Sequence, residues 1–393
     1  MDLSSDPVVI IGYARTPLGK FQGNLKDLSA PELGAAAISG ALASSGIAAD
    51  RVGKVIMGCV LSAGIGQAPA RQAALLAGLD PAVPCLSINK MCGSGMEAIM
   101  LGHDMIKAGS ADVVIAGGME SMSNAPYLFS RNRSLSIGHQ TVYDHMILDG
   151  LEDPWEHRLM GDYAEDCAEE CRIDRGMQDH FATESLKRAL SSAADRFMAQ
   201  AIVPVETHAG KETFRVSRDE LPKPEALDKI ARLKPVFRTN GTITPASSSG
   251  IADGAAAVVL TRASTALELY LEIEARIVAH ASHAGKAARF PVAPVHAIRK
   301  LLDSLNLKSS DIDLYEINEA FAVVPLIAMQ ELAMPHARVN IQGGACAMGH
   351  PIGASGARIL VTLLSSLARH RLRSGLASLC IGGGEATAMM VER

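Results

Sequence analysis

The chain has 393 residues, of which 48% are hydrophobic, and this is enough to bury the cores of two or three compact domains. Its formal net charge of -5 argues against nucleic acid as a partner, because a phosphate-binding surface needs a basic excess. No segment approaches the roughly 20 uninterrupted apolar residues of a membrane span, and Met1–Pro7 lacks a basic signal segment, so we expect neither membrane insertion nor export.

The cysteine and glycine content indicates the compartment and the fold class. Seven cysteines, an odd number, are scattered through apolar surroundings and do not suit a disulfide framework. We therefore expect free thiols in a reducing compartment, the cytoplasm. Aromatic residues make up only 4% of the chain and glycines number 35, which favours helices packed closely on sheets with many tight turns. An α/β architecture is the expectation.

The two ends of the chain predict the same elements in the same order. Each end has a helix, a strand, a second strand end, a helix start rich in small residues, and a buried strand next to a glycine pair or run. The matched segments are 30–42 and 290–302, 52–59 and 312–319, 88–89 and 339–340, 93–95 and 354–356, and 111–120 and 379–385. Two copies of one α/β unit predict two sheets with helices around them, related by a pseudo-twofold axis.

The middle of the chain belongs to neither copy. Residues 121–248 are rich in proline and predict one amphipathic helix over 178–198, preceded by a shorter helix near 163–171. We expect three parts: an N-terminal half formed by residues 1–120 with 249–270, an inserted loop domain over 121–248, and a C-terminal half over 271–393. The insertion is long enough to cover a site formed by the duplicated halves.

One segment inside the insertion runs against the overall charge. Lys211–Arg238 carries eight basic and five acidic residues, a local excess of 8 - 5 = +3. Such a segment is either a solvated loop of mixed charge or a landing surface for a compact polyanion.

Cys92 is the first candidate for chemistry. Residues 89–98 predict a strand end, a tight turn and a helix that begins at or next to Cys92. A thiol at a helix N-terminus is near unpaired N–H groups and the positive end of the macrodipole, which lower the thiol pKa and favour the nucleophilic thiolate. The alternative is a buried cysteine that only fills space.

His350 is the second candidate. It lies in a glycine-rich loop just before a helix, and Pro351 disfavours helical geometry at His350 and so keeps it in the turn. Because this helix start corresponds to the one after Cys92, the two can meet across the pseudo-twofold axis and form a nucleophile and base pair. A histidine in a glycine turn can also be a structural hydrogen-bonding group, so this prediction depends on the repeat.

Two further polar residues end predicted strands. Asn318 follows the strand 312–317, and Cys380 lies at the end of 376–381, just before the glycine run Gly382–Gly384. Backbone N–H groups of a glycine run can donate to a developing oxyanion, and a second thiol can move a proton to or from carbon. The alternatives are core filling for Cys380 and a helix N-cap for Asn318.

Several motifs, in this combination and order, resemble those of thiolases over nearly the entire chain. The matching segments are Arg15–Pro17, Asn89–Gly95, Gly118–Ser123, Asn318–Phe321, Gly349–Arg358 and Cys380–Gly384. The resemblance implies an α/β thiolase fold with two pseudo-twofold-related halves in five layers, α/β/α/β/α, and an inserted loop domain. It further implies a homodimer or a homotetramer built from dimers.

The resemblance also implies the reaction and the role of each site residue. Cys92 is acylated by an acyl-CoA, His350 activates it, and Cys380 serves as acid and base. The N–H groups of Cys92 and Gly382 hold the oxyanion, and His350, with a water positioned by Asn318, holds the second thioester. The reaction is a reversible condensation of acyl-CoA with acetyl-CoA to a 3-oxoacyl-CoA and CoA. Coenzyme A and its esters are substrates, and no permanently bound cofactor is expected.

The coenzyme contacts and the acyl chain are less constrained. The resemblance implies that the pantetheine channel is lined by Ser249, Met160, Phe237, Ala320 and Phe321, with Lys223 near the nucleotide. Leu159 stands where short-chain biosynthetic thiolases often have a histidine, and Ala246–Ser249 departs from their usual Gly-Asn-Ala-Ser. An acetyl-CoA acetyltransferase is the expectation, and a 3-ketoacyl-CoA thiolase for longer or branched chains, as in fatty-acid metabolism, stays open.

Other classes fit the residues less well. A ketoacyl synthase typically uses a cysteine with two histidines, whereas the partner positions here hold Asn318, His350 and Cys380. A Cys-His hydrolase would need water access to the acyl-enzyme, and a non-catalytic thiolase-like acyl-CoA-binding protein would not need the full reactive set. No glycine run fits the dinucleotide fingerprint. No metal site is expected, because Cys167 and Cys171 have no nearby partner pair and His280 and His283 stand alone.

Overall fold

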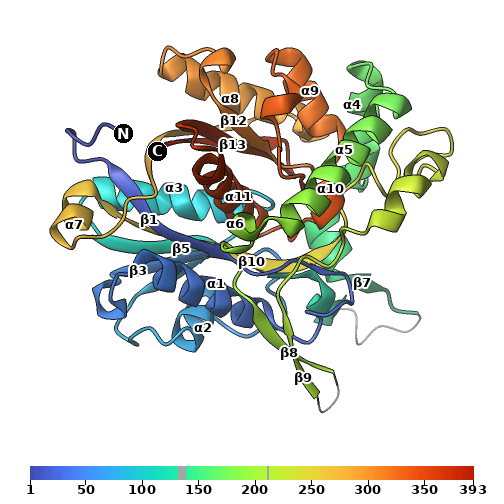
Figure 1. The fold of residues 1–393 in the computed structure, drawn as a ribbon. Helices are drawn as coiled ribbons and strands as arrows, with labels where there is room; N and C mark the ends of the chain where they lie inside the picture. The colour runs from blue at the N-terminus through green and yellow to red at the C-terminus, as the bar shows by residue number, and fades with distance from the viewer. Residues whose placement is uncertain (132–138, 210–211) are drawn as a thin grey trace.

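A computed structural model of the chain describes residues 1–131, 139–209 and 212–393. Helices and strands alternate in five layers, α/β/α/β/α (Figure 1). The layer order from one outer face to the other is α1 and α2, the first sheet, α3 with α11, the second sheet, and α8 with α9. The fold class expected from the sequence is confirmed.

The first sheet has the strand order β4–β3–β5–β10–β1. β3 is parallel to β4 and β5, whereas β10 is antiparallel to β5 and β1. The central strands are buried along nearly their whole length, as expected for a sheet covered on both faces. The strands are β1 Val8–Arg15, β2 Gly19–Lys20, which pairs with β10, β3 Lys54–Gly58, β4 Cys85–Ile88, β5 Val113–Ser121 and β10 Ala252–Arg262.

The second sheet has the order β12–β13–β14–β11 and the same pattern of directions. β12 is parallel to β13, and Val339 forms a parallel bridge to Tyr315 in the place that β4 takes in the first sheet. The two sheets are also joined at their edges, because β1 pairs with β11 over two residues of each strand. The strands are β11 Ala275–Ala284, β12 Leu314–Ile317, β13 Ser374–Ile381 and β14 Glu385–Glu392.

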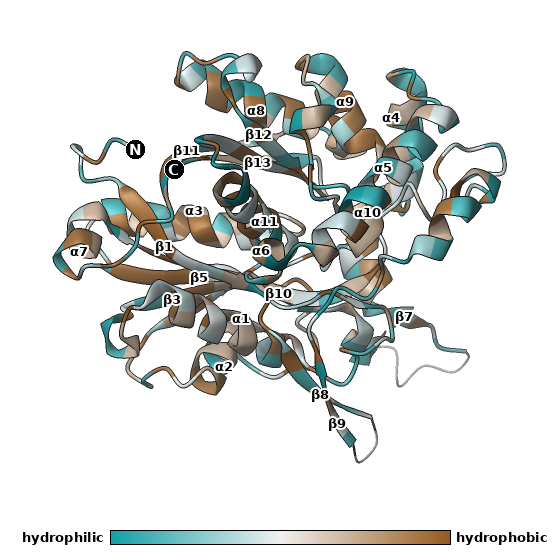
Figure 2. Ribbon diagram, viewed as in Figure 1, coloured by the Kyte–Doolittle hydropathy of each residue, from teal (hydrophilic) through white to brown (hydrophobic). Residues whose placement is uncertain are grey.

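The helices cover both sheets and separate them. Buried apolar side chains form three main clusters, one on each outer sheet face and one around α3 and α11 between the sheets. Figure 2 shows this pattern, with hydrophobic strands and helix faces turned inward and hydrophilic segments outside. The helices of the two halves are α1 Ala30–Ser45, α2 Pro69–Leu76, α3 Ser94–Lys107, α7 Ala263–Glu268, α8 Ala293–Ser304, α9 Val323–Glu331, α10 Ala345–Met348 and α11 Ser355–His370.

The internal repeat is visible in the elements. α1 corresponds to α8, and both are followed by a residue in the left-handed region, Gly46 at φ 68° and Asn306 at φ 54°. β3 corresponds to β12, and α3 corresponds to α11. One matched pair is wrong in register: Gly117 and Gly118 lie inside β5, whereas Gly382–Gly384 form the turn after β13. Gly117 and Gly118 leave room for close backbone neighbours, whereas Gly383 and Gly384 adopt a positive φ in a turn. The shared residue type made the two runs look equivalent in the sequence.

The short 3-10 turns of the halves are η1 Ala49–Arg51, η2 Met122–Asn124, η6 Ala287–Val292, η7 Ser309–Asp311 and η8 His336–Arg338. The elements between the halves are β6 Tyr127–Phe129, β7 Val142–Asp144, the π-helical η4 Ile147–Leu151, α4 Met160–Glu170, α5 Arg175–Ala194, α6 Arg196–Ala199, β8 Val205–Ala209, β9 Glu212–Val216 and η5 Pro224–Arg232.

The helix predicted over 178–198 is in fact two helices. Asp195 has an extended backbone, which ends α5, and its carboxylate accepts a hydrogen bond from the Phe197 N–H and so caps α6. The three-part division with limits at 120, 248 and 270 stays a prediction. In the described ranges, no helix combines the length and the apolar character that crossing a bilayer requires.

Candidate active site

A cavity of about 280 Å³ lies where the starts of α3 and α11 approach the end of β13. Cys92, His350 and Cys380 all line it, together with Gly382. The sequence placed these residues in two different halves of the chain, and the fold brings them to one apolar cavity. This is the convergence on which the sequence interpretation depended.

Close packing of α3 against α11 makes this convergence possible. A Cβ added at Gly95 would lie 2.8 Å from the Ala357 nitrogen, and one added at Gly356 would lie 2.4 Å from the Met96 nitrogen. Real Cβ atoms essentially never come this close to backbone. The two glycines therefore let the helix starts, and the reactive residues just before them, approach each other.

Cys92 lies in a tight turn two residues before α3 begins. Met91 is in the left-handed region at φ 47°, and Ser94 closes the turn by accepting the Lys90 N–H at 2.8 Å and donating to the Met91 carbonyl at 2.6 Å. The N–H groups of Cys92 itself and of Gly382 point at the Cys92 sulfur. These are the two donors that the resemblance assigns to an oxyanion.

The expected lowering of the Cys92 pKa is wrong. The residue keeps some accessible surface toward the cavity, but its thiol is enclosed by protein, and burial raises the pKa to about 11 despite the two N–H donors. Nearby Glu120 raises it further. α3 begins two residues after Cys92, so the helix dipole acts on the thiol only weakly. The loss of hydration on burial outweighs this dipole effect on the pKa. Cys92 is therefore a thiol at rest and needs a base.

His350 is held as a neutral base that faces the cavity. Its pKa is lowered to about 3, first by burial and then by the nearby Arg358 guanidinium. Its Nδ1 lies 2.5 Å from Ser355 Oγ, and that hydroxyl spends its single proton on the Pro351 carbonyl at 2.9 Å. Nδ1 must then carry the proton and donate to Ser355. Nε2 is left with a free lone pair, and it is buried without a hydrogen-bond partner.

The loop around Gly250 fixes the backbone of His350. The His350 N–H donates to the Gly250 carbonyl at 2.9 Å, and His350 forms a β-bridge with Ile251. Gly349 has φ 95°, and a Cβ there would lie 2.6 Å from the Ala252 side chain. Gly250 and Ile251, which directly precede β10, thus tie the histidine turn to the first sheet.

Cys380 is the penultimate residue of β13 and is buried at the cavity wall. Burial, and secondarily the neighbouring Cys92, raise the pKa of its thiol well above the usual value. Gly383 and Gly384, at φ 92° and 88°, make the turn into β14. A thiol that stays protonated at neutral pH is suited to act first as an acid.

Asn318 lies behind His350 and is not among the residues lining the cavity. Its Nδ2 is 3.5 Å from His350 Nδ1, and its Oδ1 accepts a 2.9 Å hydrogen bond from Arg358 Nη2. The predicted water between Asn318 and the substrate therefore stays a prediction.

All five residues expected in the pantetheine channel line the cavity. They are Ser249, Met160, Phe237, Ala320 and Phe321. The Ser249 N–H donates to the Ala320 carbonyl at 2.9 Å, and the rings of Phe237 and Phe321 meet edge to face at 5.8 Å. Ser249 belongs to the loop 244–250, and Ala320 and Phe321 belong to the turn after β12. Met160 begins α4, and Phe237 lies between η5 and the loop 244–250.

Lys223 does not line this cavity. It is an exposed residue just before η5, so its contact with a nucleotide stays a prediction. In the basic segment, Arg238 pairs with Asp166, and Lys211 lies outside the described residues. Lys229, Arg232 and Lys234 are exposed at the surface.

Sequence reasoning missed several residues that build the site. Ser355 and Arg358 belong to a segment that was recognised, but neither was given a role there. Glu120 accepts N–H groups from Val60, Leu61 and Gly353 at 2.8–3.0 Å, and so joins the loop after His350 to the first half. The available signal was the spacing of Ser355, which lies five residues after His350 and is the first residue of α11. Further apolar lining residues are Met122, Ile147, Leu151, Phe290 and Ile352.

A larger cavity of about 760 Å³ lies between α5–α6 and α11. It contains none of the candidate catalytic residues, and the Arg15–Asp219 ion pair, at 2.6 Å, occupies part of its wall. The smaller cavity is the candidate active site because the reactive groups converge there.

Comparisons with known proteins agree with this geometry. The family description "Thiolase, N-terminal domain" matches residues 8–264, and "Thiolase, C-terminal domain" matches residues 271–393. The acetyl-CoA acetyltransferase of Schizosaccharomyces pombe is 44% identical over 389 residues and covers 98% of both chains. That of Pseudomonas aeruginosa is also 44% identical over 389 residues, covering 98% of this chain and 99% of its own. The crystal structure of the Bacillus anthracis acetyl-CoA acetyltransferase is 37% identical, with a TM-score of 0.96 over 98% of both chains.

Proposed function

The chain belongs to the thiolase family and is an acyltransferase, and from this premise we propose that it acts as an acetyl-CoA acetyltransferase with Cys92 as the acylated residue. The thiolase reaction condenses two CoA thioesters reversibly through an acyl-cysteine. Here the proposed substrates are acetyl-CoA and acetoacetyl-CoA with CoA, since two curated relatives identical at 44% carry that activity in their names.

In the first step, His350 Nε2 takes the proton of the Cys92 thiol while the sulfur attacks the thioester carbonyl. The oxyanion forms next to the N–H groups of Cys92 and Gly382. As the C–S bond to coenzyme A breaks, Cys380 gives its proton to the leaving thiolate. CoA departs, and the enzyme holds an acyl group on Cys92, an imidazolium at His350 and a thiolate at Cys380.

In the second step, the Cys380 thiolate removes a proton from the α-carbon of a bound acetyl-CoA. The imidazolium of His350 donates a hydrogen bond to the thioester oxygen and stabilises the enolate. The enolate carbon attacks the acyl carbon on Cys92, and the C–S bond to Cys92 breaks. Cys92 recovers its proton from His350, so all three groups return to their starting states, and thiolysis is the reverse path.

One observation carries this assignment. His350 Nε2 is a buried nitrogen with a free lone pair and no partner, and it belongs to a residue that lines the same cavity as two protonated thiols. An unsatisfied buried polar atom costs free energy, so its retention favours a working role. A structural histidine would have both nitrogens satisfied.

The test is mass spectrometry of the intact protein after incubation with acetyl-CoA. We expect an acetyl-sized increase that maps to Cys92 and is absent in Cys92→Ala. Cys380→Ala is expected to be acetylated, more slowly, but to form no acetoacetyl-CoA. Acetylation that persists in Cys92→Ala would overturn the assignment, and acetyl-CoA breakdown without an acceptor would instead indicate a hydrolase.

A 3-ketoacyl-CoA thiolase for longer chains is the second candidate. Met122, Ile147 and Leu151 line the cavity with apolar side chains next to Cys92, and these could enclose an extended acyl group. Comparing kcat/KM for acetoacetyl-CoA and 3-oxooctanoyl-CoA decides between the two. At least about a tenfold preference, 1.4 kcal/mol, for acetoacetyl-CoA supports the first proposal, and the reverse preference supports the second.

We also propose that coenzyme A and its esters bind in the cavity only as substrates and products, and that no cofactor is bound permanently. We further propose that the protein forms a homodimer or homotetramer and that it works in the cytoplasm. The edge strand β4, with Leu86 exposed, offers unpaired backbone to a second copy. Light scattering after size-exclusion chromatography measures the assembly. A protein that stays monomeric over the micromolar range of concentration would contradict the proposed dimer or tetramer.

A further inference from the structure

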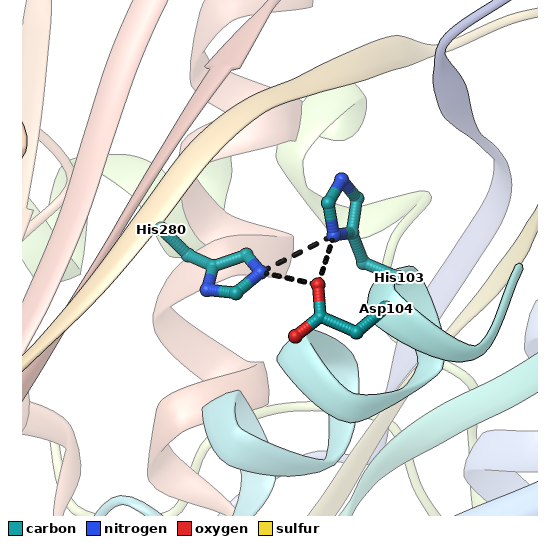
Figure 3. A group of neighbouring side chains, drawn as sticks. All are labelled: His103, Asp104 and His280. Atoms are coloured by element: carbon teal, nitrogen blue, oxygen red, sulfur yellow. Dashed lines mark hydrogen bonds and ion pairs between the residues drawn. The ribbon is translucent and has the colours of Figure 1, made fainter. Parts of the chain in front are cut away.

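Two histidines and an aspartate from distant parts of the chain lie together at the join between the two halves. His103 and Asp104 are near the end of α3, and His280 is on β11 (Figure 3). His103 Nδ1 is 2.8 Å from Asp104 Oδ1, and His280 Nε2 is 3.0 Å from the same oxygen and 3.2 Å from His103 Nδ1. Two imidazole nitrogens and one carboxylate oxygen therefore face a common point.

A β-bulge in β11 puts His280 on the side that faces α3. The pairing with β14 shifts between Ile277 and Ala279, so one extra residue, Val278, is accommodated there. Val278 and Ala279 both pack on the outer cluster under α8, whereas His280 returns to the face of Ile277, toward α3. Without the bulge, strict alternation would point His280 away from His103.

Protons alone satisfy this group poorly. If both imidazoles donate to Asp104 Oδ1, two N–H groups lie 3.2 Å apart and aim at one oxygen. If one imidazole nitrogen keeps its lone pair there, only the other imidazole can donate a hydrogen bond to it. The carboxylate oxygen of Asp104 has no proton, so it cannot donate to that nitrogen. A cation at the common point would accept all three lone pairs at once.

The spacing fits a transition-metal ion. Zinc binds imidazole nitrogen at about 2.0–2.1 Å and carboxylate oxygen at about 2.0–2.2 Å, so tetrahedral ligand atoms lie roughly 3.3 Å apart. The three distances of 2.8–3.2 Å need only a small outward movement. In the described part of the chain, no other three His, Cys, Asp or Glu residues bring their ligand atoms within 4.8 Å of one another.

We propose that His103, Asp104 and His280 form a binding site for a divalent transition-metal ion of the zinc type. Two nitrogen ligands and one oxygen ligand suit Zn²⁺ and Co²⁺ and do not suit Mg²⁺ or Ca²⁺, which prefer oxygen. The Asp104 side chain is 58% exposed, so water can fill the remaining positions and the ion can enter from solvent. The sequence expectation that His280 stands alone is wrong.

The site joins the two halves of the fold. α3 belongs to the first half and β11 to the second, so a bound ion would clamp their packing and stabilise the folded protein. It is built from residues outside the active-site cavity, and its loss should leave the acyltransferase reaction intact.

The experiment is calorimetric titration of the untagged, chelator-treated full chain with ZnCl₂. We expect one zinc equivalent in the wild type that Asp104→Asn binds at least about tenfold more weakly and His280→Ala about a hundredfold more weakly. Asp104 is exposed, so its substitution tests the site without threatening the fold. At a zinc concentration a few times the wild-type Kd, zinc should raise the melting temperature of the wild type clearly more than that of either variant.

His283→Ala is the matched control, since His283 is on the same strand and stacks on His296 at 4.6 Å. It should bind zinc as the wild type does. All variants keep the seven cysteines, so any zinc bound by thiols is bound equally by the wild type and by every variant. The difference between the Co²⁺ spectra of the wild type and of a ligand variant should therefore lack a thiolate charge-transfer band. Equal zinc affinity in the wild type and both ligand variants, or equal loss in His283→Ala, would overturn the proposal.

Discussion

The starts of α3 and α11 occupy equivalent places in the two halves, yet they hold different reactive groups. Ser94 opens α3, and its hydroxyl closes the turn that presents Cys92 by bonding to backbone on both sides. Ser355 opens α11 and also donates to backbone, but its oxygen accepts from the imidazole of His350. Serines at equivalent positions thus have different roles: Ser94 shapes the turn that presents Cys92, and Ser355 fixes the tautomer of His350.

This difference teaches how a duplicated fold can build an asymmetric site. Neither helix start contains both a nucleophile and a base. The N-terminal copy provides the nucleophile Cys92, and the C-terminal copy provides the base His350. Their meeting depends on Gly95 and Gly356, which allow backbone contact between the two helices. If the comparison is right, changes at the two starts should differ in kind as well as in size.

The largest effect is expected at the start of α3. Cys92→Ala removes the atom that carries the acyl group, so condensation and thiolysis should fall by about 10⁴-fold or more. Initial rates with acetoacetyl-CoA and CoA measure this. The variant should keep the wild-type melting temperature within a few degrees, and substantial remaining turnover would mean that the nucleophile lies elsewhere.

The start of α11 should give the second largest effect. His350→Ala removes the base but leaves the nucleophile, and loss of general base catalysis costs about 10²–10⁴-fold. Rapid-mixing mass spectrometry of Cys92 acylation measures the step directly. If acylation of His350→Ala proceeds at the wild-type rate, then the two helix starts do not cooperate.

The protonation state of Cys92 provides a third test. Because the pKa is raised to about 11, the thiolate fraction, and with it the rate of alkylation by iodoacetamide, should rise about tenfold per pH unit, so about a hundredfold from pH 7 to pH 9. Peptide mapping of the alkylated residue checks this, with Cys92→Ala as background. A rate that levels off below pH 8 would instead favour the helix effect expected from sequence.

The smallest effects separate the two serines. Ser355→Ala removes the acceptor that fixes the His350 tautomer, and a lost hydrogen bond of about 1 kcal/mol should lower kcat about fivefold and change its pH profile. Ser94→Ala should lower the free energy of unfolding by a similar amount with the kcat pH profile unchanged. Identical profiles in both variants would remove the functional distinction between the two turns.

Much of this protein could be predicted from its sequence because the signals are local or repeated. Strand and helix periodicity, the glycine turns and the duplication together predicted the α/β layers and put Cys92, His350 and Cys380 at corresponding edges. Proline after His350 and glycine after Cys380 restrict the backbone wherever they occur. The family motifs added the order of the chemistry.

Only the tertiary structure decided the protonation of the site and the grouping of distant residues. Burial raises the pKa of Cys92 and lowers that of His350, and burial depends on every layer of the fold rather than on the neighbouring residues. His280 meets His103 across 177 positions of sequence because a single bulge turns its side chain. Desolvation and side-chain direction arise from packing, and no local pattern in the sequence encodes them.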